Sequence, residues 1–381
     1  MKYCTECLLP DTKPDLWFTE DGVCAACMAF KNRVAVNWEE KLAELVEILE
    51  WGKKKSKSKW DCIIPVSGGK DSTKQVLVVK DLGFNPLCVV STTCDLSEYG
   101  EKNIRNLNNL GVDIIEFSPN PHVRRRLNRI GLETVGDISW PEHLGIFTTP
   151  VRIAVHFEIP LLIWGENSQN EYGGPTEAQQ SRVLDRRWLE EFGGLLGMRV
   201  GDLVRTFGFT ESEVEFYQYP SIREIEELGV KGIFLGQFVP WDGFTNSLVA
   251  LNHGFNSYHS VIEGSFVNYE NLDNLQAGIH DYFKYLKFGF GRASDLASMH
   301  IRRGRISREQ AVRIVRLRDG MYPSTYLGVP LSEILGKIGL TIKEFNEICD
   351  RYTNLKLFAR KSNGQLERRA DGSPKLVEQI K

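Results

Sequence analysis

Six consecutive residues near position 70 have the types and order of a phosphate-binding loop. Backbone N–H groups at the start of a helix attract anions, and paired glycines let a phosphate approach the main chain. Serine hydroxyls can add hydrogen bonds, and an aspartate at this position suits a Mg²⁺ ion chelated by the phosphate. The loop matches neither G-x-x-x-x-G-K-[ST] nor G-x-G-x-x-G, which excludes the Walker A and dinucleotide-binding motifs. The predicted phosphate-binding residues are Ser67, Gly68, Gly69, Lys70, Asp71 and Ser72, and Asp71 is also a predicted catalytic residue.

Four of the eight cysteines form two C-x-x-C pairs near the N-terminus: Cys4, Cys7, Cys24 and Cys27. Pairs at this spacing are typical of a zinc ribbon or knuckle. Four thiolates leave no open coordination position, so we predict a structural Zn²⁺ that stabilises a segment too short to bury its own core. An iron–sulfur cluster and paired disulfides are the alternatives. The remaining cysteines are scattered and receive no role: Cys62, Cys88, Cys94 and Cys349.

Short apolar runs alternate with helical stretches through the middle of the chain, and the glycine loop follows the first run. The runs are rich in Val and Ile and too short for buried helices, so they read as strands buried on both faces. They lie at 61–66, 86–90, 112–117, 160–164 and 232–238. Such βαβ alternation predicts an α/β fold with a doubly wound parallel sheet, whose ligand lies beyond the carboxyl ends of the strands.

The strand pattern ends after about residue 241, and helical patterns follow. One covers about 275–287, and two others open with the capping-box patterns Ser307-x-x-Gln310 and Thr341-x-x-Glu344. The stretch KSNGQLERRADGSPK is expected to be loosely structured, and GKKKSKSK at 52–59 to be a solvated linker. We therefore predict four regions: a zinc-binding module (1–36), a helix and basic linker (37–59), an α/β domain (60–240) and a helical C-terminal region (241–381).

The composition excludes several classes of protein. The 381 residues are 42% hydrophobic and 25% charged, which argues against disorder and fibres. With 47 basic and 50 acidic residues the net charge is −3, so nucleic acid is not an expected partner. The sequence has no apolar run long enough for a membrane span and no secretory signal pattern. We expect a soluble, cytoplasmic protein.

SGGKDS after a buried strand resembles the SGGxDS motif of the PP-loop ATP pyrophosphatase family. The resemblance implies cleavage of ATP between its α- and β-phosphates, with pyrophosphate held by the loop and AMP transferred to a substrate oxygen. It also implies that backbone near Val90 and Ser91 faces the adenine. A loop after a later strand, beginning at Gly165, would complete the site with Glu166, Asn167 and Glu171 as ribose, metal or ammonia ligands. Exposed polar loop residues are the alternative reading of these last three.

The nucleophile depends on the type of PP-loop enzyme, and two types fit poorly. A tRNA-thiolating enzyme would use a sulfur-carrying cysteine such as Cys94, but no C-x-x-C accompanies it and the net charge is negative. A lone cysteine beside a strand is usually a small buried hydrophobe. A self-contained glutamine amidotransferase would need a glutaminase domain with its own nucleophilic cysteine, and the sequence has no room for one.

The whole chain except its tail resembles the N-acetyl sugar amidotransferases of lipopolysaccharide O-antigen and flagellar-glycan biosynthesis. The resemblance rests on CTECLLP…GVCAAC, SGGKDS, WGENSQNEYGG, LGQFVPWD and FGFGRASDLASMHIRRGRISREQAV, with a small departure at Gln237. It implies an ATP-dependent ligase that adenylylates the acetamido oxygen of a sugar, after which ammonia displaces AMP. The ammonia would come from a separate glutaminase subunit resembling that of imidazole glycerol phosphate synthase, with or without its cyclase-like companion.

Arginines in the last of these motifs could bind the phosphate and carboxylate groups of a nucleotide-linked sugar. Arg292, Arg302, Arg303 and Arg305 lie close together in the sequence, and Asp295 could position them. A solvated helix face is an equal alternative. The predicted substrate-binding residues are Trp241, Asp242, Arg292, Asp295 and Arg302, and the seven histidines show no metal-ligand spacing.

Overall fold

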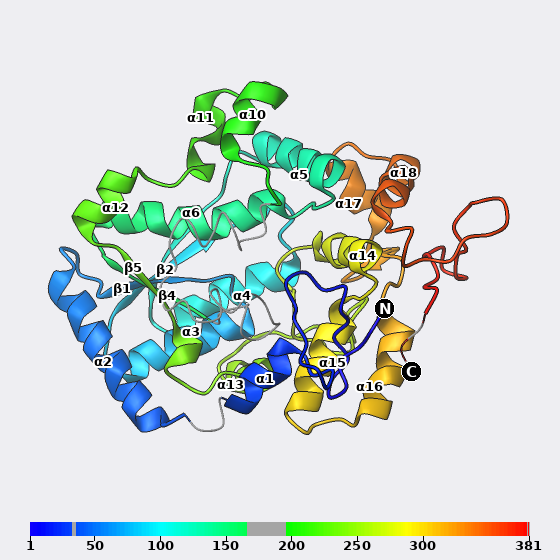
Figure 1. Cartoon of the computed structure of the whole chain (residues 1–381). Coiled ribbons are helices and arrows are strands. Elements are labelled where there is room, and N and C mark those ends of the chain that lie inside the picture. Colours follow the sequence, from blue (N-terminus) through cyan, green and yellow to red (C-terminus); the bar gives the residue numbers. More distant parts are fainter. Residues whose placement is uncertain (33–35, 166–195, 379, 381) are drawn as a thin grey trace.

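The computed structural model describes residues 1–32, 36–165, 196–378 and 380 (Figure 1). The predicted residues Glu166, Asn167 and Glu171 lie outside this part of the chain. None of the helices in the described ranges is long and apolar enough to cross a membrane.

A five-stranded parallel sheet forms the centre of the α/β region, as the apolar runs predict. Its strand order is β3-β2-β1-β4-β5, so the direction of winding reverses between β1 and β4. The strands are β1 (Cys62–Pro65), β2 (Pro86–Ser91), β3 (Asp113–Phe117), β4 (Leu161–Trp164) and β5 (Lys231–Phe234). The last predicted strand is too long, because the chain turns into the 3₁₀-helix η3 (Leu235–Gln237) beyond Phe234.

Helices cover both faces of the sheet, which explains why its central strands β1, β2 and β4 are mainly apolar. Ile64 and Ile163 pack with α2, α3 and α4 on one face, whereas Ile63 and Leu162 pack with α6 on the other. Figure 1 shows these two helical layers on either side of the strands. The helices of this region are α2 (Trp38–Lys55), α3 (Lys70–Asp81), α4 (Glu98–Asn109), α5 (Pro121–Val135), α6 (Trp140–Phe157), α10 (Val200–Phe207), α11 (Glu211–Val214), η2 (Glu215–Tyr217) and α12 (Ile222–Leu228).

The first half of the predicted basic linker is helical instead. Helix α2 continues through Gly52 to Lys55, and its lysines lie in the last turn, where cations favour the helix dipole. Gly52 is buried against the sheet, since a Cβ there would lie 2.6 Å from Leu161 Cδ2 and 2.9 Å from the Asp61 carbonyl oxygen. The glycine therefore permits close packing of α2 and does not end the helix.

The C-terminal region is mainly helical, with a core around Phe283 and Phe345 that also includes Leu132 and Ile138 of the α/β region. Both predicted capping boxes form, and Ser307 and Thr341 accept hydrogen bonds from Gln310 N and Glu344 N at 3.2 Å. Its helices are α13 (Gly243–Leu251), α14 (Ala277–Phe288), α15 (Arg292–Arg302), α16 (Arg308–Arg318), α17 (Leu331–Lys337) and α18 (Ile342–Tyr352).

Two details of this region differ from the expectation. A short antiparallel pair, β6 (Thr325–Tyr326) and β7 (Val329–Pro330), interrupts the helices. The tail is paired and not loose: Ala359 N donates to the Lys375 carbonyl and Lys375 N to the Glu367 carbonyl, at 2.8 and 2.9 Å. The tail is held by backbone hydrogen bonds, and these leave no apolar periodicity in the sequence from which to predict them.

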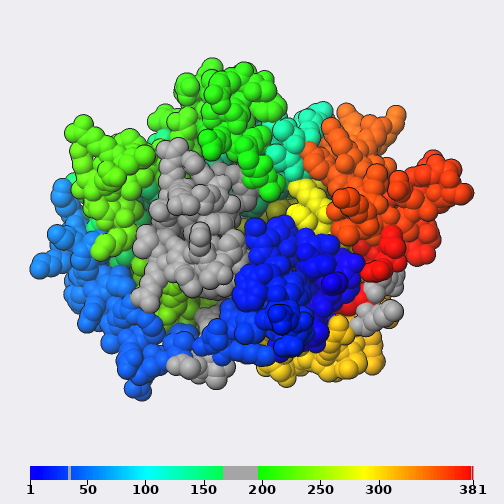
Figure 2. Space-filling model, in the orientation of Figure 1, coloured from blue at the N-terminus to red at the C-terminus, as the bar shows by residue number. Residues whose placement is uncertain are grey.

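The N-terminal module, which ends with α1 (Ala25–Asn32), packs against the C-terminal region. Leu8 lies in a buried cluster with Ala293 and Ala297 of α15, and its N–H donates to Ser298 Oγ at 3.2 Å. Figure 2 shows the module on the surface, bordered by the C-terminal helices. The termini are close together, since the Met1 ammonium pairs with Glu378 Oε2 at 2.9 Å.

Candidate ATP site and four-cysteine centre

The glycine loop joins β1 to α3 and has the backbone form of an anion site. Gly68 is left-handed at φ 81°, and Gly69 is the N-cap residue of α3. The two serine hydroxyls brace the loop: Ser72 Oγ accepts from Ser67 N at 3.0 Å, and Ser67 Oγ accepts from Gly69 N at 3.4 Å. The loop is thus held in shape by its own side chains, with the start of α3 facing a cavity.

That cavity is open to solvent and has a volume of about 110 Å³. One wall is the whole loop, and α4 contributes Gly100 and Asn103. The opposite wall comes from the C-terminal region and includes Tyr269, Glu270 and Asp273. The two regions predicted separately from the sequence therefore share one polar pocket at the carboxyl end of β1.

Lys70 lines this pocket, and its side chain is buried. Its ammonium group pairs with the neighbouring Asp71 carboxylate and with Glu270 Oε1 at 2.9 Å. Burial alone would lower the pKa of Lys70, but the two carboxylates outweigh it and hold the pKa well above its ordinary value. Asn246 Nδ2 of α13 donates to Asp71 Oδ1 at 2.8 Å. Lys70 is therefore a permanent cation, and Asp71 is oriented from two sides.

The predicted adenine-side and late-loop residues lie at the neighbouring strand ends. Val90 is buried at the end of β2, and Ser91 Oγ accepts from Thr149 Oγ1 at 3.4 Å. Gly165 follows β4, and its carbonyl accepts from Gly236 N at 2.9 Å. A Cβ at Gly165 would lie 3.1 Å from Trp241 Cζ2, so the structure brings Gly165 and Trp241 together at this edge.

Asp242 is held by two arginines of the C-terminal region. Arg303 Nε lies 2.9 Å from Asp242 Oδ1, Arg305 Nη1 lies 3.0 Å from the same oxygen, and Asp242 also caps α13. Burial would raise the pKa of Asp242, but hydrogen bonds from Arg305 and Thr245 and the charge of Arg303 lower it well below its ordinary value.

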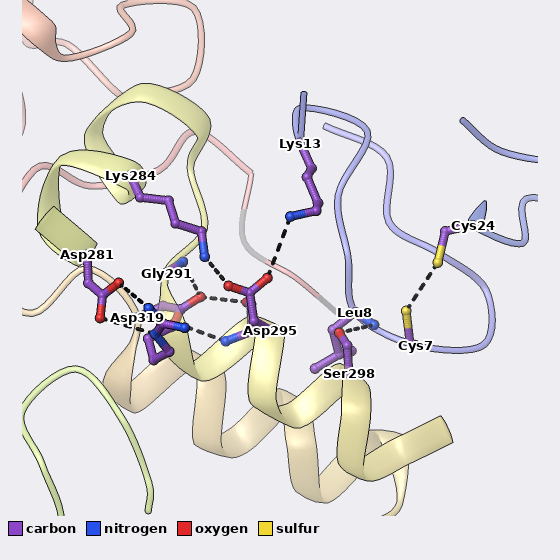
Figure 3. A network of polar contacts seen from close by, with 12 residues as sticks. Cys7, Leu8, Lys13, Cys24, Asp281, Lys284, Gly291, Asp295, Ser298 and Asp319 are labelled. Carbon is purple, nitrogen blue, oxygen red and sulfur yellow. Dashed lines mark hydrogen bonds and ion pairs between the residues drawn. The ribbon is translucent and has the colours of Figure 1, made fainter. Parts of the chain in front are cut away.

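The other predicted substrate residues do not join this group. Arg292 Nη2 pairs with Asp281 Oδ1 at 3.1 Å in a different cavity. Asp295 is buried, and its ion pairs are with Lys284 and Lys13, as Figure 3 shows; that it positions the arginines stays a prediction. Arg302 lies near Cys7 of the N-terminal module: hydrogen bonds with Cys24 and Cys27 lower the pKa of that thiol, and the charge of Arg302 lowers it further. A substrate-binding role of these three residues stays a prediction.

Several residues of the pocket were not predicted. Glu270, Tyr269, Asp273 and Asn246 lie in segments without a motif, and only the folded chain brings them to the loop. Arg303 and Arg305 belong to the arginine cluster that the sequence does show, but the sequence does not indicate which members face Asp242. These residues make the C-terminal region part of the site.

The four N-terminal cysteines converge as their spacing predicts. Their sulfurs lie within 4.8 Å of one another, and all four side chains are at most 2% exposed. Cys4 Sγ accepts hydrogen bonds from the backbone N–H groups of Cys7 and Cys24, at 3.5 and 3.2 Å. Such bonds stabilise a thiolate, so the donor set fits a tetrahedral Zn²⁺, and the closed shell fits a structural role.

Comparisons with known proteins bear on the C-terminal region and on the α/β region separately. Residues 263–370 match the family described as "LPS biosynthesis protein WbpG-like, C-terminal domain". No match was found among curated proteins.

Solved structures that resemble about half of the chain include two synthetases. The NH3-dependent NAD synthetase from Campylobacter jejuni subsp. jejuni NCTC 11168 is 12% identical, covers 51% of this chain and 92% of its own, and has a TM-score of 0.30. The NMN synthetase from Francisella tularensis is 15% identical, with 51% and 92% covered and a TM-score of 0.29.

A third resemblance is to the predicted subunit of tRNA methyltransferase from Methanocaldococcus jannaschii, at 15% identity, 50% and 75% coverage and a TM-score of 0.26. Scores this low do not establish a common fold, so the fold assignment rests on the strand order and the glycine loop. The family match agrees with the link to lipopolysaccharide biosynthesis that the sequence motifs predict. The region from 263 to 370, which forms one wall of the loop pocket, is therefore similar to the WbpG-like C-terminal domain.

Proposed function

We propose that the protein is an ATP-dependent amidotransferase that converts the acetamido group of an N-acetylated sugar, nucleotide-linked when it reacts, into an acetamidino group. The observation that carries this proposal is the shared pocket: a PP-loop faces Glu270 and Asp273 of a WbpG-like domain. A nucleotide bound by the loop would thus lie against the part of the chain that is related to lipopolysaccharide biosynthesis.

The proposed chemistry follows from the poor leaving ability of an amide oxygen. The acetamido oxygen attacks the α-phosphorus of ATP, the α–β phosphoanhydride bond breaks, and pyrophosphate leaves. Ammonia then attacks the activated carbon, and the oxygen leaves with AMP while the nitrogen stays. Backbone N–H groups at the start of α3 are placed to hold the pyrophosphate, because a helix N-terminus binds anions.

A magnesium ion would assist this reaction by neutralising the triphosphate, and Asp71 is the residue that would hold it. The carboxylate is an oxygen donor of the kind Mg²⁺ prefers, and it borders the pocket. Asn246 and Lys70 orient the carboxylate in the free protein. Lys70 stays charged and contributes a fixed positive charge to the pocket floor.

The thiols in the described part of the α/β and C-terminal regions do not offer a reactive nucleophile. Burial raises the pKa of Cys62 and Cys349 well above the ordinary thiol value and that of Cys88 to about 12. Burial also raises the pKa of Cys94, the residue that the tRNA-thiolation alternative would need. We therefore propose that a separate glutaminase, with or without a cyclase-like companion, supplies the ammonia.

The decisive experiment supplies ATP, ammonium and a panel of nucleotide-linked N-acetyl sugars to the purified protein. The expected product is lighter than its substrate by one mass unit, the difference between an oxygen atom and an NH group, and AMP forms in equal amount. Asp71→Asn should abolish AMP release. Asp81→Asn, on the exposed end of the same helix, is the matched control and should keep it. ATP turnover with bound tRNA and no sugar product would favour thiolation, and full activity of Asp71→Asn would refute the mechanism.

A further inference from the structure

A buried carboxylate at the junction of the α/β and C-terminal regions faces two imidazoles. Asp137 is 4% exposed, and its two oxygens point to different histidines. Oδ1 lies 2.8 Å from His280 Nδ1, and Oδ2 lies 3.3 Å from His143 Nδ1. The histidine rings are 5.4 Å apart at an interplanar angle of 81°. Three groups that can each bind a metal thus share one small volume.

The local backbone fixes the carboxylate in this position. Asp137 lies in the turn between α5 and α6, after the left-handed Gly136. Its N–H donates to the Gly131 carbonyl at 3.1 Å, and Ser139 N donates to Asp137 Oδ1 at 2.9 Å. Gly131 has no room for a side chain, because a Cβ would lie 2.5 Å from the Asp137 carbonyl oxygen. The carboxylate is therefore presented by a rigid turn.

The distances can be compared with those of a coordination shell. Ligand atoms about 2.1 Å from one tetrahedral metal lie roughly 3.4 Å from each other. The two measured nitrogen–oxygen separations are 2.8 and 3.3 Å, and one ligand atom from each residue lies within 4.8 Å of the others. The 3.3 Å separation is close to this value, whereas Asp137 and His280 would have to move apart by about 0.6 Å to admit an ion.

We propose that Asp137, His143 and His280 form a second metal site, for a transition-metal dication of the zinc type. Two imidazoles and one carboxylate are donors that zinc, iron and nickel accept, whereas Mg²⁺ and Ca²⁺ prefer oxygen shells. Three protein ligands leave one position for water, in contrast to the closed shell of the cysteines. Lys287 is the nearby cation, and its ammonium donates to the Val135 carbonyl at 2.8 Å, which holds it on the backbone.

The site would tie two regions of the chain together. Asp137 and His143 come from the α/β region, whereas His280 lies on α14, inside the WbpG-like match. Ile138 and Leu132 already share an apolar core with Phe283 of α14. An ion at this junction would stabilise the folded arrangement of both regions, because a ligand that binds only the native state raises its stability.

The test uses the full chain with zinc bound to the cysteines, to which Co²⁺ is added. We expect one equivalent of Co²⁺ to bind with visible ligand-field absorption and no thiolate charge-transfer band, and to raise the Tm. Asp137→Asn and His280→Gln should each weaken Co²⁺ binding at least tenfold and remove the Tm increase. His122→Gln, at an exposed position on α5, is the control and should bind Co²⁺ like the wild type.

The competing interpretation is a hydrogen-bonded link without a metal. It predicts no ligand-field absorption, since the d¹⁰ Zn²⁺ at the cysteines contributes none, and a Tm that does not respond to Co²⁺; either result overturns the proposal. Equal Co²⁺ affinity in the wild type and in both variants would overturn it as well. If Asp137→Asn does not fold, His280→Gln carries the same comparison, because His280 is half-exposed and glutamine keeps a polar side chain on α14.

Discussion

Gly68 and Gly69 are adjacent in the phosphate loop, but the structure gives them different roles. Gly68 has φ 81°, and a Cβ there would lie 2.6 Å from Ile104 N and 2.8 Å from Asn103 C, both in the backbone of α4. Gly69 has φ −67°, and its Cβ would meet, within the described part of the chain, only Ser67 Oγ at 3.3 Å. We therefore predict that alanine at position 68 lowers the stability of the fold, whereas alanine at position 69 weakens ATP binding.

The magnitudes follow from backbone strain and crowding. An alanine in the left-handed region costs about 1–2 kcal/mol, and a methyl group forced against packed backbone costs about 1–3 kcal/mol more. Gly68→Ala should thus lower the free energy of unfolding by about 2–5 kcal/mol. Gly69→Ala has an ordinary φ at an N-cap, so its cost should be about 1 kcal/mol or less.

Calorimetry and ATP titration separate the two effects. Gly68→Ala should lower the Tm by several degrees, since a change of 1 kcal/mol shifts a unit of this size by roughly 2–4 °C. Gly69→Ala should keep its Tm but bind ATP at least tenfold more weakly, because its methyl group enters the anion site beside the first N–H of α3. An unchanged Tm for Gly68→Ala, or unchanged ATP affinity for Gly69→Ala, would refute this reading of the loop.

Three further predictions concern charges and metal. Glu270→Gln should lower the free energy of unfolding by about 1–3 kcal/mol, which a urea titration measures. The loss is smaller than for a fully broken buried ion pair because Lys70 keeps Asp71 as a partner. The same variant should raise the KM for ATP in an AMP-release assay. Cys7→Ser should leave far less than one equivalent of zinc by mass spectrometry and should lower the Tm, whereas zinc retention would exclude the site. The pKa of Asp242 is lowered in the folded protein, so the carboxylate stabilises the fold above about pH 4 and this stabilisation is lost as the pH falls. The difference in the free energy of unfolding between wild type and Asp242→Asn should therefore shrink from pH 5 to about pH 2. A difference that widens would contradict this.

The sequence was sufficient wherever burial or spacing left a local signature. Strands buried on both faces need continuous apolar runs, which is why residues such as Ile63 and Ile64 revealed β1. The cysteine pairs were visible because the two cysteines of each pair are three residues apart in the sequence. Arrangements between distant elements leave no such signature: the pairs of Lys70 with Glu270 and of Asp295 with Lys13 depend on how whole regions pack.

The arginine cluster shows how a correct motif can be divided by the fold. Spacing within 14 residues suggested one substrate-binding group, but a helix places successive residues on different faces. Arg292, at the start of α15, turns to Asp281, whereas Arg303 and Arg305, beyond its end, turn to Asp242. Proximity in the sequence therefore does not establish that these arginines share a site or a partner.

A continuous series of contacts connects the four-cysteine module to the phosphate loop. Phe30 of α1 lies 5.4 Å from the Arg303 guanidinium, and Arg303 pairs with Asp242. Asp242 caps α13, the helix that carries Asn246, and Asn246 donates to Asp71. Because each contact fixes the next element, the metal module has a physical route to the orientation of the predicted catalytic carboxylate. We therefore expect loss of metal from the cysteine module to disturb the orientation of Asp71, although none of the module's described residues lines the pocket.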